Sequence, residues 1–186
     1  MRSLHLLSRE HSGLLIVDLQ EKLLSVIPGS SRIVWNTTRL IRAAAAMGVT
    51  HSATLQYPHG LGPMSLSLIN YFPSPHEKLR FSAVIEPIVT WCREANLSQV
   101  VVCGIETHIC IQQTAMDLMA AGYDVYVPAD AVASRNELDH CTALRRLDAC
   151  GATITTVESV LFEWCESAAD PAFKQISALV REEFSS

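Results

Sequence analysis

Residues 13–18 read GLLIVD and residues 99–110 read QVVVCGIETHIC. In both stretches an unbroken apolar run is followed by a charged or reactive side chain. Runs of this kind, rich in Val and Ile and without polar alternation, are typical of strands that are buried on both faces of a parallel sheet. With three further strands at residues 49–55, 123–127 and 152–156, the sequence predicts five parallel strands.

Helical segments separate these strands, at residues 31–47, 85–95, 107–121 and 136–150. Three of the helices stop at a glycine, the residue that most readily takes the left-handed conformation of a helix C-terminus. Alternating strands and helices are typical of βα units with right-handed crossovers. We therefore expect a Rossmann-like, three-layer α/β/α sandwich that forms a single domain over residues 1–186.

Two segments fit this alternation less well. Residues 56–75 hold four of the eight prolines and read as a long irregular loop, a kind of segment that is often functional. Near the C-terminus, Asp170 is the predicted N-cap and Pro171 the first residue of a last helix. Its apolar stripe comprises Phe173, Ile176, Leu179, Val180 and Phe184.

The composition excludes several classes of function. The net charge is −5 and no Lys/Arg run is present, which argues against a nucleic-acid partner. No stretch of about 18 apolar residues and no signal-peptide pattern occurs, so we expect no membrane partner and a cytoplasmic location. The six cysteines include no CxxC pair, so free thiols are expected. A charged fraction of 18% is low and favours a homo-oligomer.

Candidate chemistry is expected at the carboxyl ends of the strands, where open parallel sheets bind ligands. Asp18 follows the first strand, although it is equally well explained as the cap of a helix that starts at Leu19. Cys110 follows the third strand. If Thr107 caps the next helix, Cys110 lies in its first turn, where the helix dipole favours a thiolate. The other cysteines are interpreted as small apolar residues, namely Cys92, Cys103, Cys141, Cys150 and Cys165.

Other motifs are weaker. Lys78, on spacing alone, is one exposed lysine among few. His108 precedes Cys110 by two residues, a spacing that points the two side chains apart on a helix. No set of His and Asp residues has convincing metal-ligand spacing, and neither GxGxxG nor a Walker motif follows a strand. We therefore predict no metal and no cofactor.

Five segments, in order along nearly the whole chain, resemble the isochorismatase-like cysteine hydrolase superfamily. The resemblance is greatest to its isochorismatase domain-containing proteins, whose substrate is unsettled. The segments are LLIVDLQ (14–20), TLQYPHGLGP (54–63), EKLRFSA (77–83), VVCGIETHICIQQTA (101–115) and VPADAVASR (127–135).

The resemblance implies a catalytic triad of Asp18, Lys78 and Cys110. It also implies a cis peptide bond between Ile105 and Glu106, which would aim backbone N–H groups near Glu106 and at Cys110 toward a reacting oxygen. A sixth strand near residues 75–80 would give a mainly parallel sheet of five to six strands. We further expect substrate contacts from Gln20, Gln56, Tyr57 and His108.

The chain departs from two branches of the superfamily. Nicotinamidases bind zinc through Asp-x-His near the second strand, whereas this chain has QYPH at residues 56–59. True isochorismatases need no cysteine. We therefore predict a cysteine hydrolase that cleaves a C–N bond of a small amide-like substrate through a thioester. Two alternatives stay open, namely a catalytically degenerate binding or scaffolding protein and a redox sensor in which Cys103 pairs with Cys110.

Overall fold

A computed structural model describes residues 2–3 and 5–184. Its sheet has seven strands, in the order β3-β2-β1-β4-β5-β7 with β6 beside the end of β4, and every ladder is parallel. The strands are β1 (Ser12–Val17), β2 (Thr50–Gln56), β3 (His76–Lys78), β4 (Gln99–Ile105), β5 (Asp124–Pro128), β6 (Val132–Ala133) and β7 (Thr153–Thr155).

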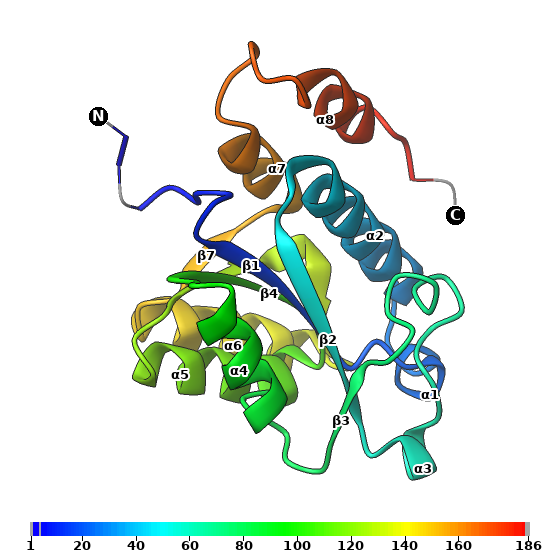
Figure 1. The fold of residues 1–186 in the computed structure, drawn as a ribbon. Helices are drawn as coiled ribbons and strands as arrows, with labels where there is room; N and C mark the ends of the chain where they lie inside the picture. The colour runs from blue at the N-terminus through cyan, green and yellow to red at the C-terminus, as the bar shows by residue number, and fades with distance from the viewer. Residues whose placement is uncertain (1, 4, 185–186) are drawn as a thin grey trace.

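Helices cover both faces of the sheet, which confirms the predicted three layers (Figure 1). The α-helices are α1 (Glu21–Leu24), α2 (Ser30–Met47), α3 (Pro58–Leu61), α4 (Glu86–Glu94), α5 (Gln112–Ala120), α6 (Glu137–Ala149), α7 (Val157–Cys165) and α8 (Phe173–Val180). A π-helical turn, η1 (Thr107–Ile111), leads into α5, and a 3₁₀ turn, η2 (Ala129–Ala131), precedes β6.

The two faces of β4 contact two separate cores. Val101 and Cys103 pack with α2, α7 and α8, whereas Val100 and Val102 pack with α4, α5 and α6. Since successive strand residues point to opposite faces, a strand with a core on each side needs apolar residues throughout. This arrangement explains the unbroken apolar runs of the central strands.

The ends of β1 and β4 approach closely at Gly104. Val17 pairs with Gly104, whose φ is +123°. A Cβ atom at this position would lie 2.0 Å from the carbonyl oxygen of Val17, so only glycine fits. As a result, the residues that follow the two strands emerge side by side at the carboxyl edge of the sheet.

The predicted elements differ from the structure mainly at their ends. The five predicted strands are confirmed with shifts of one or two residues, and β3 lies where the resemblance implied a sixth strand. The two-residue β6 and helix α7 were not predicted. The apolar sequence of α7, VESVLFEWC, follows β7 with no glycine or proline to mark a boundary.

Two helix starts were predicted wrongly. Helix α8 begins at Phe173, two residues later than the predicted start at Pro171, although the Asp170 carboxylate accepts the N–H of Ala172 (2.8 Å), as an N-cap residue does, and also binds Arg9 (2.6 Å). The segment predicted as one helix over residues 107–121 begins with the π-helical turn, and Thr107 does not cap it.

The predicted loop at residues 56–75 is tied to the body of the protein. It contains α3, and Met64, Leu68 and Phe72 are buried in the core beside α2. An isolated antiparallel bridge joins Gln20 to Met64. The irregular segment therefore has a fixed course around the carboxyl edge of β1 and β2.

Candidate active site

Asp18 leaves the end of β1 in the left-handed conformation, with φ 58°. Its N–H donates to the carbonyl of Thr54 (3.1 Å), which holds it against β2. Its carboxylate is fully buried and accepts the Thr54 hydroxyl at Oδ1 (2.9 Å) and the Lys78 ammonium at Oδ2 (2.6 Å). An ordinary residue held at positive φ is uncommon, and such backbone often marks a functional position.

Lys78 reaches Asp18 from the edge strand β3. In the strand ladder, Lys78 pairs with Gln56 of β2. Its ammonium donates to the Asp18 carboxylate, to Gln56 Oε1 (2.7 Å) and to the carbonyl of Phe81 (2.9 Å). The carbonyl of Arg80 lies 3.2 Å from the same nitrogen, so the ammonium has more acceptors around it than its three hydrogens can serve at once. Lys78 is therefore a paired, buried cation and not the exposed lysine that its sequence context suggested.

Cys110 completes this cluster from the other side. Its sulfur lies 3.8 Å from Lys78 Nζ, and the residue is only 6% exposed. Burial, followed by the nearby charge of Asp18, raises the pKa of the Cys110 thiol to about 12, although Lys78 opposes the change. This rise is opposite in direction to the lowering that the start of the helix was expected to produce.

Asp18 is affected by the same surroundings. Burial raises the pKa of its carboxyl group, while the ammonium of Lys78 and the hydrogen bonds that the carboxylate accepts lower it. Removal from water always penalises the charged form of a carboxyl group, and contact with a cation opposes that penalty. The buried acid and the buried thiol thus lie within one hydrogen-bonded group.

The backbone around Cys110 has an unusual pattern of hydrogen bonds. In the π-helical turn, the carbonyl of Glu106 accepts the N–H groups of Ile109 (3.1 Å) and Ile111 (3.2 Å). Within the described chain, the N–H of Cys110 makes no corresponding bond to Glu106. The peptide bond between Ile105 and Glu106 is cis, at the position that the resemblance implied.

Gln20 and Gln56 are both bonded within the protein, and their expected contact with a substrate stays a prediction. The amide nitrogen of Gln20 donates to the carbonyls of Gln56 (3.1 Å) and Gly62 (2.7 Å), and its oxygen accepts the N–H of Gln56. Gln56 binds Lys78 and the carbonyl of Leu79. Both glutamines are buried, so they position the neighbouring strand and loop.

Tyr57 and His108 lie on different sides of the cluster. Tyr57 is exposed and lines a cavity of about 410 Å³ whose other lining residues include Lys78 and Leu79. His108 places Nδ1 2.9 Å from the hydroxyl of Ser134. Sequence reasoning missed Thr54 and Ser134, because their partners are distant in the chain and no local pattern marks them.

Cys103 and Cys110 lie on opposite sides of the sheet. Cys103 is buried in the core with α2, where the Thr37 hydroxyl is 4.0 Å from its sulfur, whereas Cys110 contacts the core with α5. Burial raises the pKa of the Cys103 thiol to about 12. Because the sheet separates the two thiols, this fold does not favour the disulfide that the redox-sensor alternative requires.

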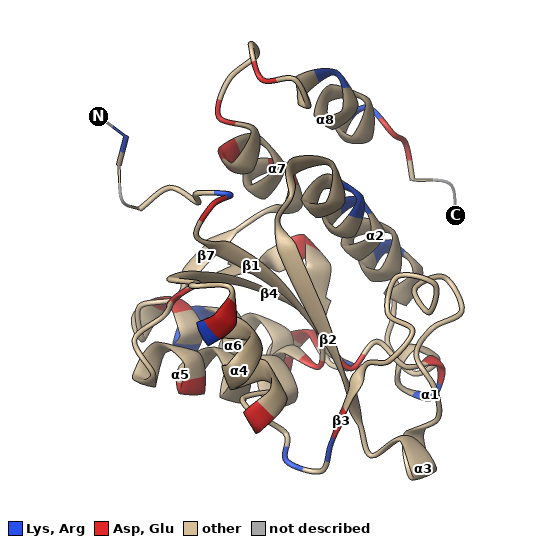
Figure 2. Ribbon diagram, viewed as in Figure 1, with Lys and Arg blue, Asp and Glu red and all other residues tan. Residues whose placement is uncertain are grey.

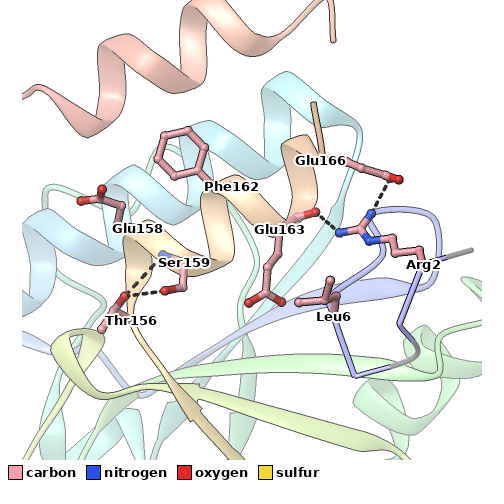
Figure 3. A pocket seen from close by; sticks show the side chains of 8 residues that line it. All are labelled: Arg2, Leu6, Thr156, Glu158, Ser159, Phe162, Glu163 and Glu166. Carbon is pink, nitrogen blue, oxygen red and sulfur yellow. Dashed lines mark hydrogen bonds and ion pairs between the residues drawn. The ribbon is translucent and has the colours of Figure 1, made fainter. Parts of the chain in front are cut away.

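A larger cavity, of about 750 Å³, lies away from this cluster between the N-terminal segment and α7 (Figure 3). Arg2 lines it and binds Glu166 and the carbonyl of Glu163. None of the three clustered residues Asp18, Lys78 and Cys110 lines it. The volume of a cavity is thus a poor guide to where nucleophilic chemistry can occur in this protein.

The described residues show no concentrated basic surface and no metal-ligand cluster. Lys and Arg residues are scattered over several elements, among them α2, α8 and the loop after β3 (Figure 2). Among residues 2–3 and 5–184, no group of three or more His, Cys, Asp or Glu side chains is arranged to hold a metal ion. Within the same residues, no helix combines the length and the hydropathy needed to cross a bilayer.

Comparisons with known proteins agree with this fold. Residues 12–159 match the family model described as "Isochorismatase domain". Isochorismatase domain-containing protein 2 of Danio rerio is 38% identical over 175 residues, which cover 94% of this chain and 89% of the relative.

Two solved structures are similar as well. One is described as the MAR1 ribonuclease of Caenorhabditis elegans, with a TM-score of 0.91, 31% identity, and coverage of 97% of this chain and 94% of the other. Another is the YcaC gene product of Escherichia coli, described as an octameric hydrolase of unknown specificity. It has a TM-score of 0.86 and 22% identity, with coverage of 96% and 91%, and shows likeness of fold alone.

The family match spans most of the chain, and the relative from Danio rerio covers nearly all of it. The parallel sheet and its flanking helices are those of isochorismatase-like α/β proteins. This chain therefore belongs to the isochorismatase family.

Proposed function

We propose that this protein is a cysteine hydrolase that cleaves the C–N bond of a small amide-like substrate. One observation carries the proposal: Asp18, Lys78 and Cys110, which are distant in the chain, meet in one buried cluster. Lys78 Nζ lies 2.6 Å from the Asp18 carboxylate and 3.8 Å from the Cys110 sulfur. An acid–base group beside a cysteine is the arrangement that nucleophilic catalysis requires.

The first step is transfer of the thiol proton of Cys110 to the carboxylate of Asp18. The raised pKa of Asp18 makes it a stronger base than an exposed aspartate. The thiol, with a pKa of about 12, stays protonated until the substrate arrives. The sulfur then bonds to the carbonyl carbon, whose oxygen takes the electron pair of the C=O double bond.

The N–H of Cys110 is a candidate donor to that oxygen, because the π-helical turn leaves it without its α-helical acceptor Glu106. One such donor is worth about 2.7–4 kcal/mol in a related type of reaction. Neutral Asp18 next gives its proton to the nitrogen, the C–N bond breaks, and the amine leaves. Water then hydrolyses the thioester and restores the thiol.

Lys78 keeps the charges of this site in balance. While Asp18 is ionised, the ammonium pairs with the carboxylate, and once the proton has moved it can pair with the thiolate. Removing either partner would leave an uncompensated charge in a buried site, which is strongly unfavourable. Neither a metal nor a cofactor takes part in the proposed sequence.

Assembly and location are part of the same proposal. The Escherichia coli YcaC protein is described as octameric, which supports a homo-oligomer here. We propose a cytoplasmic location and a small-molecule substrate. The ribonuclease activity in the name of the Caenorhabditis elegans protein is not carried over, because 19 acidic residues outnumber 14 basic ones and the basic side chains are scattered.

The test combines turnover with trapping of the intermediate. A panel of small primary amides is incubated with the protein, ammonia release is followed, and rapidly quenched samples are analysed by intact mass. We expect an acyl adduct on Cys110 that is absent from Cys110→Ala, together with loss of turnover. Cys141→Ala, at an exposed thiol, is the matched control and should behave like the unaltered protein.

Full activity of Cys110→Ala would overturn the cysteine mechanism. If the unaltered protein neither released ammonia nor formed an adduct with any amide, the hydrolase proposal would fail. A degenerate binding or scaffolding protein would then be the better description.

A further inference from the structure

Three consecutive residues beside Cys110 bond to one segment of the chain, residues 134–140. This segment joins β6 to the first turn of α6. The pairs are Glu106 with Arg135, Thr107 with His140 and His108 with Ser134. The proposed mechanism uses none of these side chains. The turn that carries the nucleophile is therefore held from outside by a separate part of the fold.

The link between Thr107 and His140 starts from a fully buried residue. Thr107 is 0% exposed, and its hydroxyl lies 2.9 Å from His140 Nδ1. Among the described residues, this hydroxyl has no other hydrogen-bond partner. Burial lowers the pKa of His140, although Glu137 opposes the change, and the lowering favours the neutral ring. A nitrogen of the neutral ring pairs with a hydroxyl either as donor or as acceptor.

Thr107 is also the first residue of the π-helical turn η1. Its carbonyl accepts the N–H of Gln112, and the carbonyl of Glu106 accepts the N–H of Ile111, five residues along in each case. An α-helical turn would instead pair Glu106 with the N–H of Cys110, four residues along. Because π-helical turns are rare and mostly interrupt α-helices, contacts from outside the turn must favour this pattern.

The bond to His140 favours it in two ways. It holds Thr107 from α6, a different element from the helix that the turn begins. It also engages a hydroxyl that would otherwise be suited to cap that helix, by accepting the N–H of Ile109 or Cys110. In a turn released from His140, the N–H of Cys110 therefore gains two competing acceptors, the Glu106 carbonyl and the Thr107 hydroxyl.

We propose that His140 is a positioning residue: its bond to Thr107 keeps the turn π-helical and keeps the N–H of Cys110 available to the substrate oxygen that becomes negative. The effect of His140 on catalysis rests on the proposed function. Its effect on the hydrogen bonding of Cys110 does not.

His140→Phe and Thr107→Val each remove the bond and keep a side chain of similar shape. Loss of an oxyanion donor lowers kcat by about 10²- to 10³-fold. Because the released turn loses the donor only part of the time, we expect kcat to fall by about 10- to 100-fold. KM should change by less than about threefold, since the donor acts in the transition state. A fall in kcat/KM that comes from KM alone would overturn the proposal.

Two further variants show whether the bond itself matters. The amide of His140→Asn can bond Thr107 from the position of Nδ1, so this variant should restore most of kcat. The double variant His140→Phe/Thr107→Val should lose no more than the more affected single variant, because both changes remove one bond. Equal losses in His140→Asn and His140→Phe, or single losses that multiply in the double variant, would contradict the assigned role.

The matched control is His11→Phe, at an exposed histidine in the turn before β1. It should keep the kcat of the unaltered protein, and urea denaturation should show that every variant is folded under the assay conditions. A loss of kcat in His11→Phe as large as in His140→Phe would remove the special role of His140.

Amide hydrogen exchange, followed by NMR residue by residue, tests the inference without any substrate. In His140→Phe the Cys110 amide should exchange about tenfold more slowly, because it gains an acceptor. A turn that was merely loosened would exchange faster. If the unaltered protein hydrolyses no amide, the hydrolase proposal fails, yet this measurement still decides the role of His140. Unchanged or faster exchange at Cys110 would overturn the inference.

Discussion

Two ion pairs join distant parts of this chain, and they differ in how far they are exposed to water. Lys78 and Asp18 are 2.6 Å apart with both side chains 0% exposed, whereas Arg2 and Glu166 are 26% and 61% exposed (Figure 3). Water screens the exposed pair, whose expected contribution is about 1 kcal/mol or less. The buried pair has no water to replace a lost partner, so each charge depends on the other.

The two ion pairs also differ in the cavities that lie beside them. The exposed pair borders a cavity of about 750 Å³ that no cysteine lines, whereas the buried pair touches the Cys110 sulfur and its Lys78 lines a cavity of about 410 Å³. In this fold the candidate reactive groups therefore lie where charged side chains are removed from water, and not beside the larger cavity. The predictions below test that contrast, beginning with the largest effect.

Asp18→Asn should reduce kcat/KM for any substrate amide by about 10²- to 10⁴-fold, because the amide cannot accept the thiol proton. Glu166→Gln makes the equivalent change in the exposed pair and should leave turnover within about twofold. Steady-state kinetics of the two variants give the comparison. Asp18→Asn with nearly full activity would show that the buried carboxylate is not the base.

Lys78→Met should lower the free energy of unfolding by about 3–5 kcal/mol, because it leaves the Asp18 carboxylate buried without its cation. Urea denaturation of the variant and the unaltered protein measures the difference. The double variant Asp18→Asn/Lys78→Met should recover part of the loss, since neither charge then remains. A loss below about 1 kcal/mol in the single variant would place the buried pair in the same class as the exposed one.

The pH dependence of turnover should reflect the raised pKa of Asp18. Activity is expected to fall as the pH decreases through this pKa, which lies above 3.8, because a protonated carboxyl group cannot accept the thiol proton. Thr54→Val removes a hydrogen bond that stabilises the carboxylate. The acid limb should then move upward by about one pH unit. A downward shift or no shift in a kcat/KM profile would contradict this assignment.

Arg2→Met should have the smallest effect, a loss of about 0.5 kcal/mol in the free energy of unfolding that disappears at high salt. The measurement is urea denaturation at low and at 1 M salt. A salt-independent loss of several kcal/mol would mean that exposure does not separate the two pairs, and the central comparison would fail.

Much of the fold was predictable from local sequence patterns. The apolar run that ends at Val17 is buried on both faces, and Gly48 ends α2 in the left-handed conformation. These features depend on residues that are neighbours in the chain, so periodicity and turn chemistry reveal them. Strand β6 escaped prediction because it is only two residues long, and helix α7 was missed although Thr156 caps its start by accepting the N–H of Ser159.

The candidate site was only partly predictable. Asp18 and Cys110 could be selected because each follows an apolar strand, and parallel strands present their carboxyl ends at one edge. Lys78 entered only through resemblance to a family. The internal roles of Gln20 and Gln56 depend on partners that no local pattern specifies.

The sequence by itself determined the five longer apolar strands, the edge of the sheet that gathers reactive side chains, and the family to which the chain belongs. Only the tertiary structure decided that Lys78 is buried against Asp18, that burial raises the pKa of the Cys110 thiol, and that Arg135 is tethered to Glu106. The reason is physical. Secondary structure follows from spacing along the chain, whereas charge state and pairing follow from distances and burial that only strand order and register create.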